Sequence, residues 1–195
     1  MAESTSVLDR AREAIDRKAW DQAYRLLSEA DDSRRLEGDA LPTLADSAYM
    51  TGHPEVAIDA WERVHAAAVR AGQDEPGAEA AGQVAALLLY TGLLAPARGW
   101  IRRAEDLLVD HPDSPVHGQL AVLLAWTCVL AGDLDGALQH ARRAIDLGTR
   151  LGVPTQDPDR WNAEARILIF QGHLRRDSPS WTRRPSPRCP GNSTP

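Results

Sequence analysis

Apolar positions recur with the period of an amphipathic helix, about 3.6 residues per turn, along most of this sequence. Between these stretches stand turn signals, among which the Gly-His-Pro of 52–54 and the segment 111–115 are strong helix breakers. The pattern predicts helices over residues 4–18, 20–32, 36–51, 55–72, 76–91, 94–109, 116–131, 134–151 and 157–171. Ser4 or Ser6 is the expected N-cap of the first. The fold class is therefore all-α.

These predicted helices also repeat as pairs. A glycine recurs every forty residues, at Gly52, Gly92, Gly132 and Gly172. An earlier copy over residues 18–27 keeps the pattern but carries Lys18 in place of the glycine. Because one helical hairpin cannot bury its own apolar face, hairpins repeated in this way must stack on one another. We expect a right-handed α-solenoid of about four and a half hairpins over residues 1–172.

The composition favours a helical fold and argues against nucleic-acid binding and membrane insertion. Hydrophobic residues make up 43% of the chain, Ala and Leu dominate, and there is one Phe. The net charge is −6, with −10 on residues 1–172 and +4 on residues 173–195, so the folded part lacks the basic surface that nucleic acid needs. The longest apolar runs, such as 84–89, are far shorter than a membrane span. A cytoplasmic location is expected, with Cys128 as a small buried residue.

The spacing of glycine, alanine and large residues resembles tetratricopeptide (TPR) repeats over about residues 5–172. The matching positions are Gly52, Ala57 and Trp61, then Gly92, Ala97, Ile101 and Ala104, then Gly132, Ala137, Ala141 and Ala144, with Trp161 in a further first helix. The resemblance implies that the glycine opens the turn and that the alanine permits a close helix crossing. Two features depart from the family: the forty-residue period exceeds its usual ~34 residues, and Ala141 replaces a bulky residue.

A narrower resemblance concerns the Ala/Arg/Leu-rich segments 60–63, 97–104 and 137–144. They are similar to the repeat region of bacterial LuxR-type transcriptional regulators. In that family a C-terminal helix-turn-helix follows the repeats and binds DNA, and nothing in this sequence matches it. The resemblance thus implies a sensory or scaffolding part without the DNA-binding part.

The C-terminal residues 173–195 are rich in Pro, Ser and Arg without helical period, which predicts a disordered tail. A shifted reading frame over 177–184 permits Leu-Ala-Leu-Leu-Asp-Glu-Ala, which would continue the fifth repeat. A frameshift near residue 176 and a genuine disordered tail are both open, and the coding DNA decides between them. Without a partner helix Leu168 and Ile169 would be exposed, so either fraying of this helix or self-association through this end is expected.

Residues that often carry chemistry do not combine into a recognisable site. His111 and His117 lie six residues apart rather than at the i, i+4 spacing of helical metal ligands. Ser114 with His117 and Asp113 is not a catalytic arrangement. Gly-Asp-Leu-Asp-Gly at 132–136 lacks the remaining ligands of a calcium loop and predicts a turn with an N-cap. We predict no catalytic residue, no metal site, no cofactor and no enzymatic activity.

Two arginine pairs recur at one repeat position, at 102–103 and 142–143. A pair of this kind on a predicted helix is typical of a solvated face. The alternative is a patch that binds an anionic ligand.

In TPR-like arrays the first helix of each hairpin lines the concave surface. By this resemblance the groove would include Asp46, Tyr49, Ala86, Tyr90, Trp126, Leu130, Arg166 and Phe170. Trp126 with Val122 and Val129 would form an apolar wall suited to a peptide, unless Trp126 packs against the next hairpin. The expected function is a non-enzymatic module for a protein or peptide partner, derived from a truncated LuxR-type regulator. The alternative is a small-molecule sensor that uses the same groove, and neither nucleic acid nor membrane is an expected partner.

Overall fold

The computed structural model describes residues 2–34 and 36–150, and these residues form helices joined by short turns. The helices are α1 (Ala2–Asp16), α2 (Trp20–Arg34), α3 (Ala40–Met50), α4 (Pro54–Arg70), α5 (Asp74–Tyr90), α6 (Leu94–Leu107), α7 (Val116–Leu130) and α8 (Leu134–Arg150). The described part contains no strand, which confirms the all-α prediction. The predicted helix over 157–171, the tail, the domain boundary at residue 172 and the expected self-association surface lie outside the described residues.

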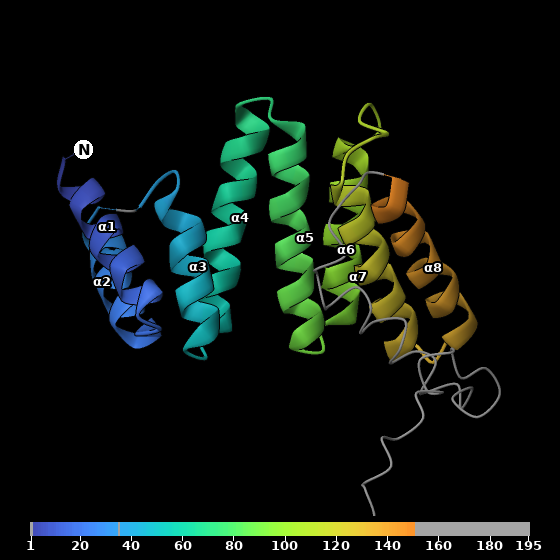
Figure 1. Ribbon diagram of the computed structural model, residues 1–195, viewed down its shortest axis with the longest axis horizontal. Helices are drawn as coiled ribbons and strands as arrows, with labels where there is room; N and C mark the ends of the chain where they lie inside the picture. The colour runs from blue at the N-terminus through green and yellow to red at the C-terminus, as the bar shows by residue number, and fades with distance from the viewer. Residues whose placement is uncertain (1, 35, 151–195) are drawn as a thin grey trace, which may run out of the picture.

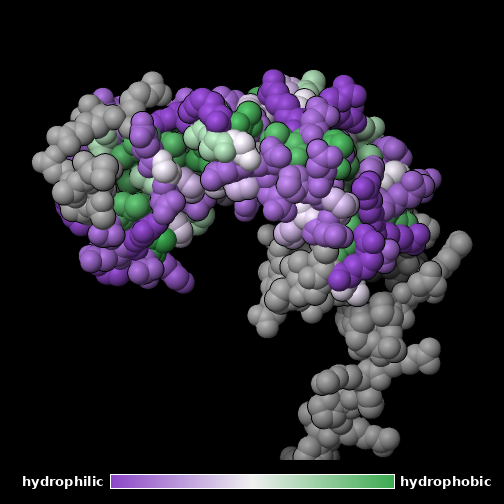
Figure 2. Space-filling model, turned by 90° about the horizontal axis from the view of Figure 1, so that it is seen from above, coloured by the Kyte–Doolittle hydropathy of each residue, from purple (hydrophilic) through white to green (hydrophobic). Residues whose placement is uncertain are grey.

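Consecutive helices pair into four hairpins that stand side by side (Figure 1). Each helix packs mainly against its neighbours in sequence, and α1 also packs against α3 and α5 against α7. Seen from above, the stack is an arch with a hollow between its two ends (Figure 2). The first helices α1, α3, α5 and α7 lie on the hollow side, which is the near side in Figure 1.

Small residues occupy the helix crossings, as the repeat pattern predicts. The alanines five residues after the turn position are completely buried, and these are Ala23, Ala57, Ala97 and Ala137. The alanines seven residues further on, Ala104 and Ala144, are buried as well. Since an alanine adds no more than one carbon beyond the backbone, paired helices approach closely at these points and bury clusters of apolar side chains along the stack. Trp61 of α4 packs against two clusters of buried residues, one drawn mainly from α1 to α4 and one from α5 and α6.

The tight turns share one hydrogen-bonding pattern. Each has one residue at positive φ, namely Lys18 (58°), Gly52 (82°), Gly72 (66°), Gly92 (79°) and Gly132 (80°). The next residue donates its N–H to the carbonyl five positions earlier, in the pairs Ala19–Ala14, His53–Ala48, Gln73–Ala68, Leu93–Leu88 and Asp133–Cys128. This is the Schellman arrangement, in which a left-handed residue after the helix satisfies its last carbonyls. Glycine adopts that backbone without steric cost, which explains its forty-residue recurrence.

Several predicted details are wrong. Helix α1 begins at Ala2, so Ser4 and Ser6 lie inside the helix and neither is its N-cap. Helix α3 begins at Ala40 rather than residue 36, because Gly38 takes a φ of 59° and the Leu36 N–H donates to Asp31 Oδ1 at 2.6 Å. Cys128 is half-buried rather than buried.

Candidate functional site

The hollow face carries apolar side chains that the fold leaves exposed. Met50, Tyr90 and Leu130 each stand two residues before a turn glycine, and they are 53%, 76% and 53% exposed. Their common register places them at the C-terminal ends of α3, α5 and α7, where the next hairpin no longer covers the helix. Repetition of exposed apolar residues along one face is a feature of interaction sites, in contrast with single scattered ones. We call Met50, Tyr90 and Leu130 the apolar row.

Tyr49 of α3 contacts Tyr90, a member of the apolar row on α5. Its ring meets the ring of Tyr90 edge to face, with 5.6 Å between centroids and an interplanar angle of 79°. This is the favourable geometry for two aromatic rings, whose edges are positive and faces negative. Because Tyr49 is 41% exposed and Tyr90 is 76% exposed, the pair presents ring surface to solvent on the hollow side.

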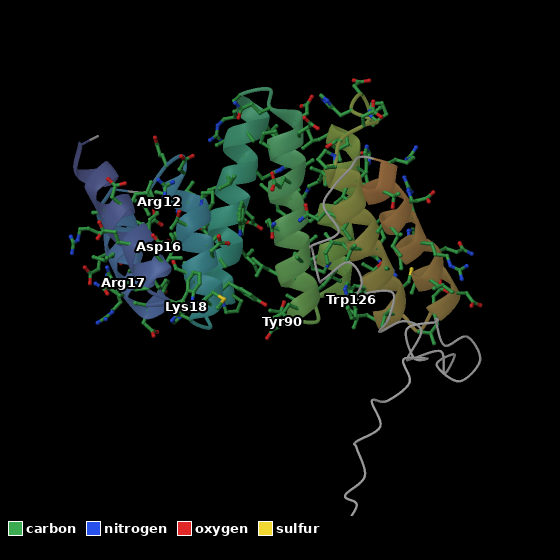
Figure 3. The ribbon with its side chains drawn as sticks, viewed as in Figure 1. Arg12, Asp16, Arg17, Lys18, Tyr90 and Trp126 are labelled. Carbon is green, nitrogen blue, oxygen red and sulfur yellow. The ribbon has the colours of Figure 1, made fainter. Side chains whose placement is uncertain are left out.

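A second row lies six residues before each turn position, where the side chains are Arg12, Asp46, Ala86 and Trp126. Asp46 reaches solvent, yet partial burial of its carboxyl raises its pKa above the ordinary value because desolvation disfavours the charged form. Ala86 and Trp126 are half-buried, and Ala86 packs against the core between α5 and α7. Figure 3 shows Trp126 and Tyr90 on the same near face.

The α1 end of this face is basic. Arg12, Arg17 and Lys18 are exposed there beside Asp16, and Figure 3 shows all four on the near side. Arg12 lies 3.8 Å from Asp39, a contact between two solvent-exposed groups that contributes little. The face therefore changes along the arch from basic at α1 to apolar at α3, α5 and α7.

Five of the predicted groove residues, Asp46, Tyr49, Tyr90, Trp126 and Leu130, thus belong to α3, α5 and α7, the first helices that lie on the hollow side. Arg166 and Phe170 lie outside the described residues. Met50 and Arg12 belong to the same two rows, and Lys18 is the turn residue of the first hairpin; the sequence reasoning missed all three. Counting from Lys18 as though it were the turn glycine would have found Arg12, and counting back from Gly52 would have found Met50.

Polar and titratable side chains outside the hollow face make hydrogen bonds that hold loops together. Asp133 Oδ1 accepts the Gly136 N–H at 2.9 Å, which confirms the predicted N-cap. In the α6–α7 link, His111 Nε2 lies 3.3 Å from Asp74 Oδ2, and His117 Nε2 lies 3.0 Å from the His111 carbonyl oxygen. Among residues 2–34 and 36–150, no three His, Cys, Asp or Glu side chains gather as metal ligands. None of the helices seen there is long and apolar enough to cross a membrane.

Comparison with known proteins identifies the fold. No protein-family model and no curated protein matches the sequence. Among solved structures, a thermophilic TPR protein of Thermus thermophilus is similar over 88% of this chain and 84% of its own, with 18% identity and a TM-score of 0.61. A putative kinesin light chain of Podosopora anserina with nearly identical TPR-like repeats is similar over 87% of each chain, with 16% identity and a TM-score of 0.57. These similarities show a TPR-like fold.

Proposed function

We propose that this chain is a non-enzymatic TPR-like scaffold that binds a protein or peptide segment on its hollow face. The observation that supports this most directly is the apolar row, where Met50, Tyr90 and Leu130 stay exposed in successive repeats. A partner that buries them would recover hydrophobic free energy that folding alone leaves unused. Aromatic side chains such as Tyr90 are also the residue type in which interface binding energy concentrates.

The charges along the face define the partner further. A segment that lies along the apolar row and continues toward α1 meets Arg12, Arg17 and Lys18 at that end. Acidic groups on this part of the partner would be attracted, while basic ones would be repelled. The partner we propose therefore has apolar side chains followed by an acidic end.

A peptide series tests this proposal. Fluorescence anisotropy of the full chain is measured with labelled peptides that carry apolar residues and an acidic, a neutral or a basic end. We expect the acidic peptides to bind best, and Tyr90→Ala to weaken binding by about tenfold or more. Val69→Ala is the matched control, because Val69 is 45% exposed but lies on α4, a second helix, and not on this face. Equal weakening by both variants, or equal binding of all three peptide types, would contradict the proposal.

The similarity of segments 60–63, 97–104 and 137–144 to LuxR-type regulators supports a more specific role. In this role the chain is a cytoplasmic sensory part of a truncated transcriptional regulator and makes no direct contact with nucleic acid. Sequencing of the coding DNA tests it. A reading frame that continues the repeats and then encodes a helix-turn-helix would support the role, and a frame without either would refute it.

A further inference from the structure

The second helices carry an arginine at one repeat position, and its surroundings differ from junction to junction. Arg63, Arg103 and Arg143 each stand eleven residues after a turn glycine. In the hairpin before each of them, a second position on the second helix is relevant, thirteen residues after that hairpin's own turn residue. This position holds Asp31 before Arg63, His65 before Arg103 and Glu105 before Arg143. The same two positions are therefore available to meet at every junction between hairpins.

At the first junction this arginine closes the space between two hairpins. The Arg63 guanidinium donates to both oxygens of Asp31, at 2.7 and 2.9 Å, and to the Leu36 carbonyl at 2.6 Å. At the second junction Trp100 fills the corresponding space, with His65 at its edge and Arg103 over its ring at 4.4 Å. Both junctions are thus occupied by the protein's own side chains.

Within the described part of the chain, no side chain closes the third junction. Glu105 and Arg143, the equivalents of Asp31 and Arg63, line a cavity of about 350 Å³ between α6, the α6–α7 link and α8. Arg143, Asp146 and Arg150 lie on one face of α8 and border this cavity, while Val109 and Pro112 line it with exposed apolar surface. A volume of this size is at the lower end for small-molecule sites.

The charges around this cavity do not pair with each other. Over the stretches 2–34 and 36–150, no ion pair joins Glu105 or Asp146 to Arg143 or Arg150, in contrast with the closed pair of the first junction. Two carboxylates and two guanidiniums give the rim no net charge. An anion such as phosphate would meet the carboxylates, and a polyamine would meet the guanidiniums, so each would be opposed by half of the rim.

We propose that this cavity binds a small zwitterion with an apolar body, of the size of an amino acid or a dipeptide. The guanidiniums of Arg143 and Arg150 receive its carboxylate, Glu105 and Asp146 receive its ammonium group, and the apolar part lies against Val109 and Pro112. Arginine is suited to this role because its fork of N–H donors matches both oxygens of a carboxylate. The charged groups of the site lie on the second helices α6 and α8, and none of them belongs to the two rows of the hollow face.

Isothermal titration calorimetry of the full chain tests the site with L-leucine, L-leucyl-L-leucine, inorganic phosphate and spermidine as probes. We expect L-leucine or the dipeptide to bind, the better of the two showing the size of the ligand, with no heat from phosphate or spermidine. Arg143→Gln and Glu105→Gln should each weaken binding about tenfold or more, since each removes a charged partner. Arg142→Gln is the matched control, because this neighbouring exposed arginine does not line the cavity.

Circular dichroism of each variant establishes that it is folded. Because Arg143→Gln and Glu105→Gln lie on different helices, one of them still tests the site if the other does not fold. Binding of phosphate or spermidine in place of the zwitterions would overturn the proposal, as would binding of no probe at about 10 mM. Equal affinities of Arg143→Gln and Arg142→Gln would also overturn it. Tyr90→Ala should leave L-leucine binding unchanged, so failure of this site and failure of the hollow-face proposal can be told apart.

Discussion

Replacement of Arg63 by glutamine tests how strongly the first two hairpins are joined. Arg63 on α4 holds Asp31 on α2 by two hydrogen bonds and the Leu36 carbonyl by a third. The hydrogen bonds raise the pKa of Arg63 further above its usual value, chiefly through Asp31, so the guanidinium stays charged at every pH the protein meets. Glutamine cannot span the same three acceptors and has no charge, so Asp31 would lose this counter-ion.

The magnitude follows from the burial of the pair. The Arg63 and Asp31 side chains are 19% and 21% exposed, so solvent screens them only in part. Removal of one partner from a fully buried pair costs about 3–5 kcal/mol, and exposed pairs contribute about 0–1 kcal/mol. We expect Arg63→Gln to lower the free energy of unfolding by about 2–3 kcal/mol. For a chain of this size that corresponds to a Tm lowered by about 4–12 °C.

Urea unfolding followed by circular dichroism measures this change, with variants compared at equal m-value. Arg103→Gln is the matched control at the same repeat position, where an exposed cation–π contact should cost only about 0.5–1 kcal/mol. A double-mutant cycle with Asp31→Asn should give a coupling of at least about 1.5 kcal/mol. An Arg63→Gln midpoint equal to that of Arg103→Gln, or strictly additive effects in the cycle, would refute the reasoning.

Three further changes are predicted. Lys18→Gly should raise the free energy of unfolding by about 0.5–1 kcal/mol in urea, because Lys18 holds a left-handed backbone with φ of 58°; a lower midpoint would argue against strain there. Asp46→Asn should stabilise the protein at neutral pH. Burial raises the folded-state pKa of this carboxyl, so the stability that the protonated Asp46 contributes is lost as the pH rises through that pKa. Thermal melts at a series of pH values should therefore show that the stabilisation by Asp46→Asn vanishes in acid. A stabilisation independent of pH would exclude desolvation of the carboxylate as its cause. Ala97→Leu, at a fully buried helix crossing, should cost about 1–3 kcal/mol by thermal unfolding, whereas the exposed Ala95→Leu should change stability by less than about 0.5 kcal/mol; equal effects would mean that Ala97 is not tightly packed.

The fold could be predicted because its determinants are local and periodic. A glycine at the Schellman position and an alanine five residues later act within one hairpin, so their spacing reveals both turn and crossing. The start of α3 could not be read in the same way, because the Leu36 N–H bonds to Asp31, whose carboxylate also accepts from Arg63 of the next hairpin. Half-burial of Cys128 likewise depends on how α8 covers α7.

The candidate site was predicted in outline for a similar reason. Register identifies which residues face the hollow, and Tyr90 and Leu130 follow from it. It does not show that Arg143 and Glu105 stay apart while Arg63 and Asp31 meet, since these pairs occupy equivalent positions. That difference arises from the side chains and link lengths around each junction, which only three-dimensional packing resolves.

The spacing of the first helices has a mechanical consequence for the arch. No Cα atoms of α3 and α5 come within 8 Å of each other, whereas α1 approaches α3 and α5 approaches α7 to that distance. On the hollow side the Tyr49–Tyr90 ring contact bridges this wider interval. A bend of the stack about α4 would therefore break few contacts between first helices on this side. We expect the arch to bend most easily at its middle, between α3 and α5. Opening or closing there would change the distance between the basic end at α1 and Leu130, so the curvature itself could adjust to the length of a partner.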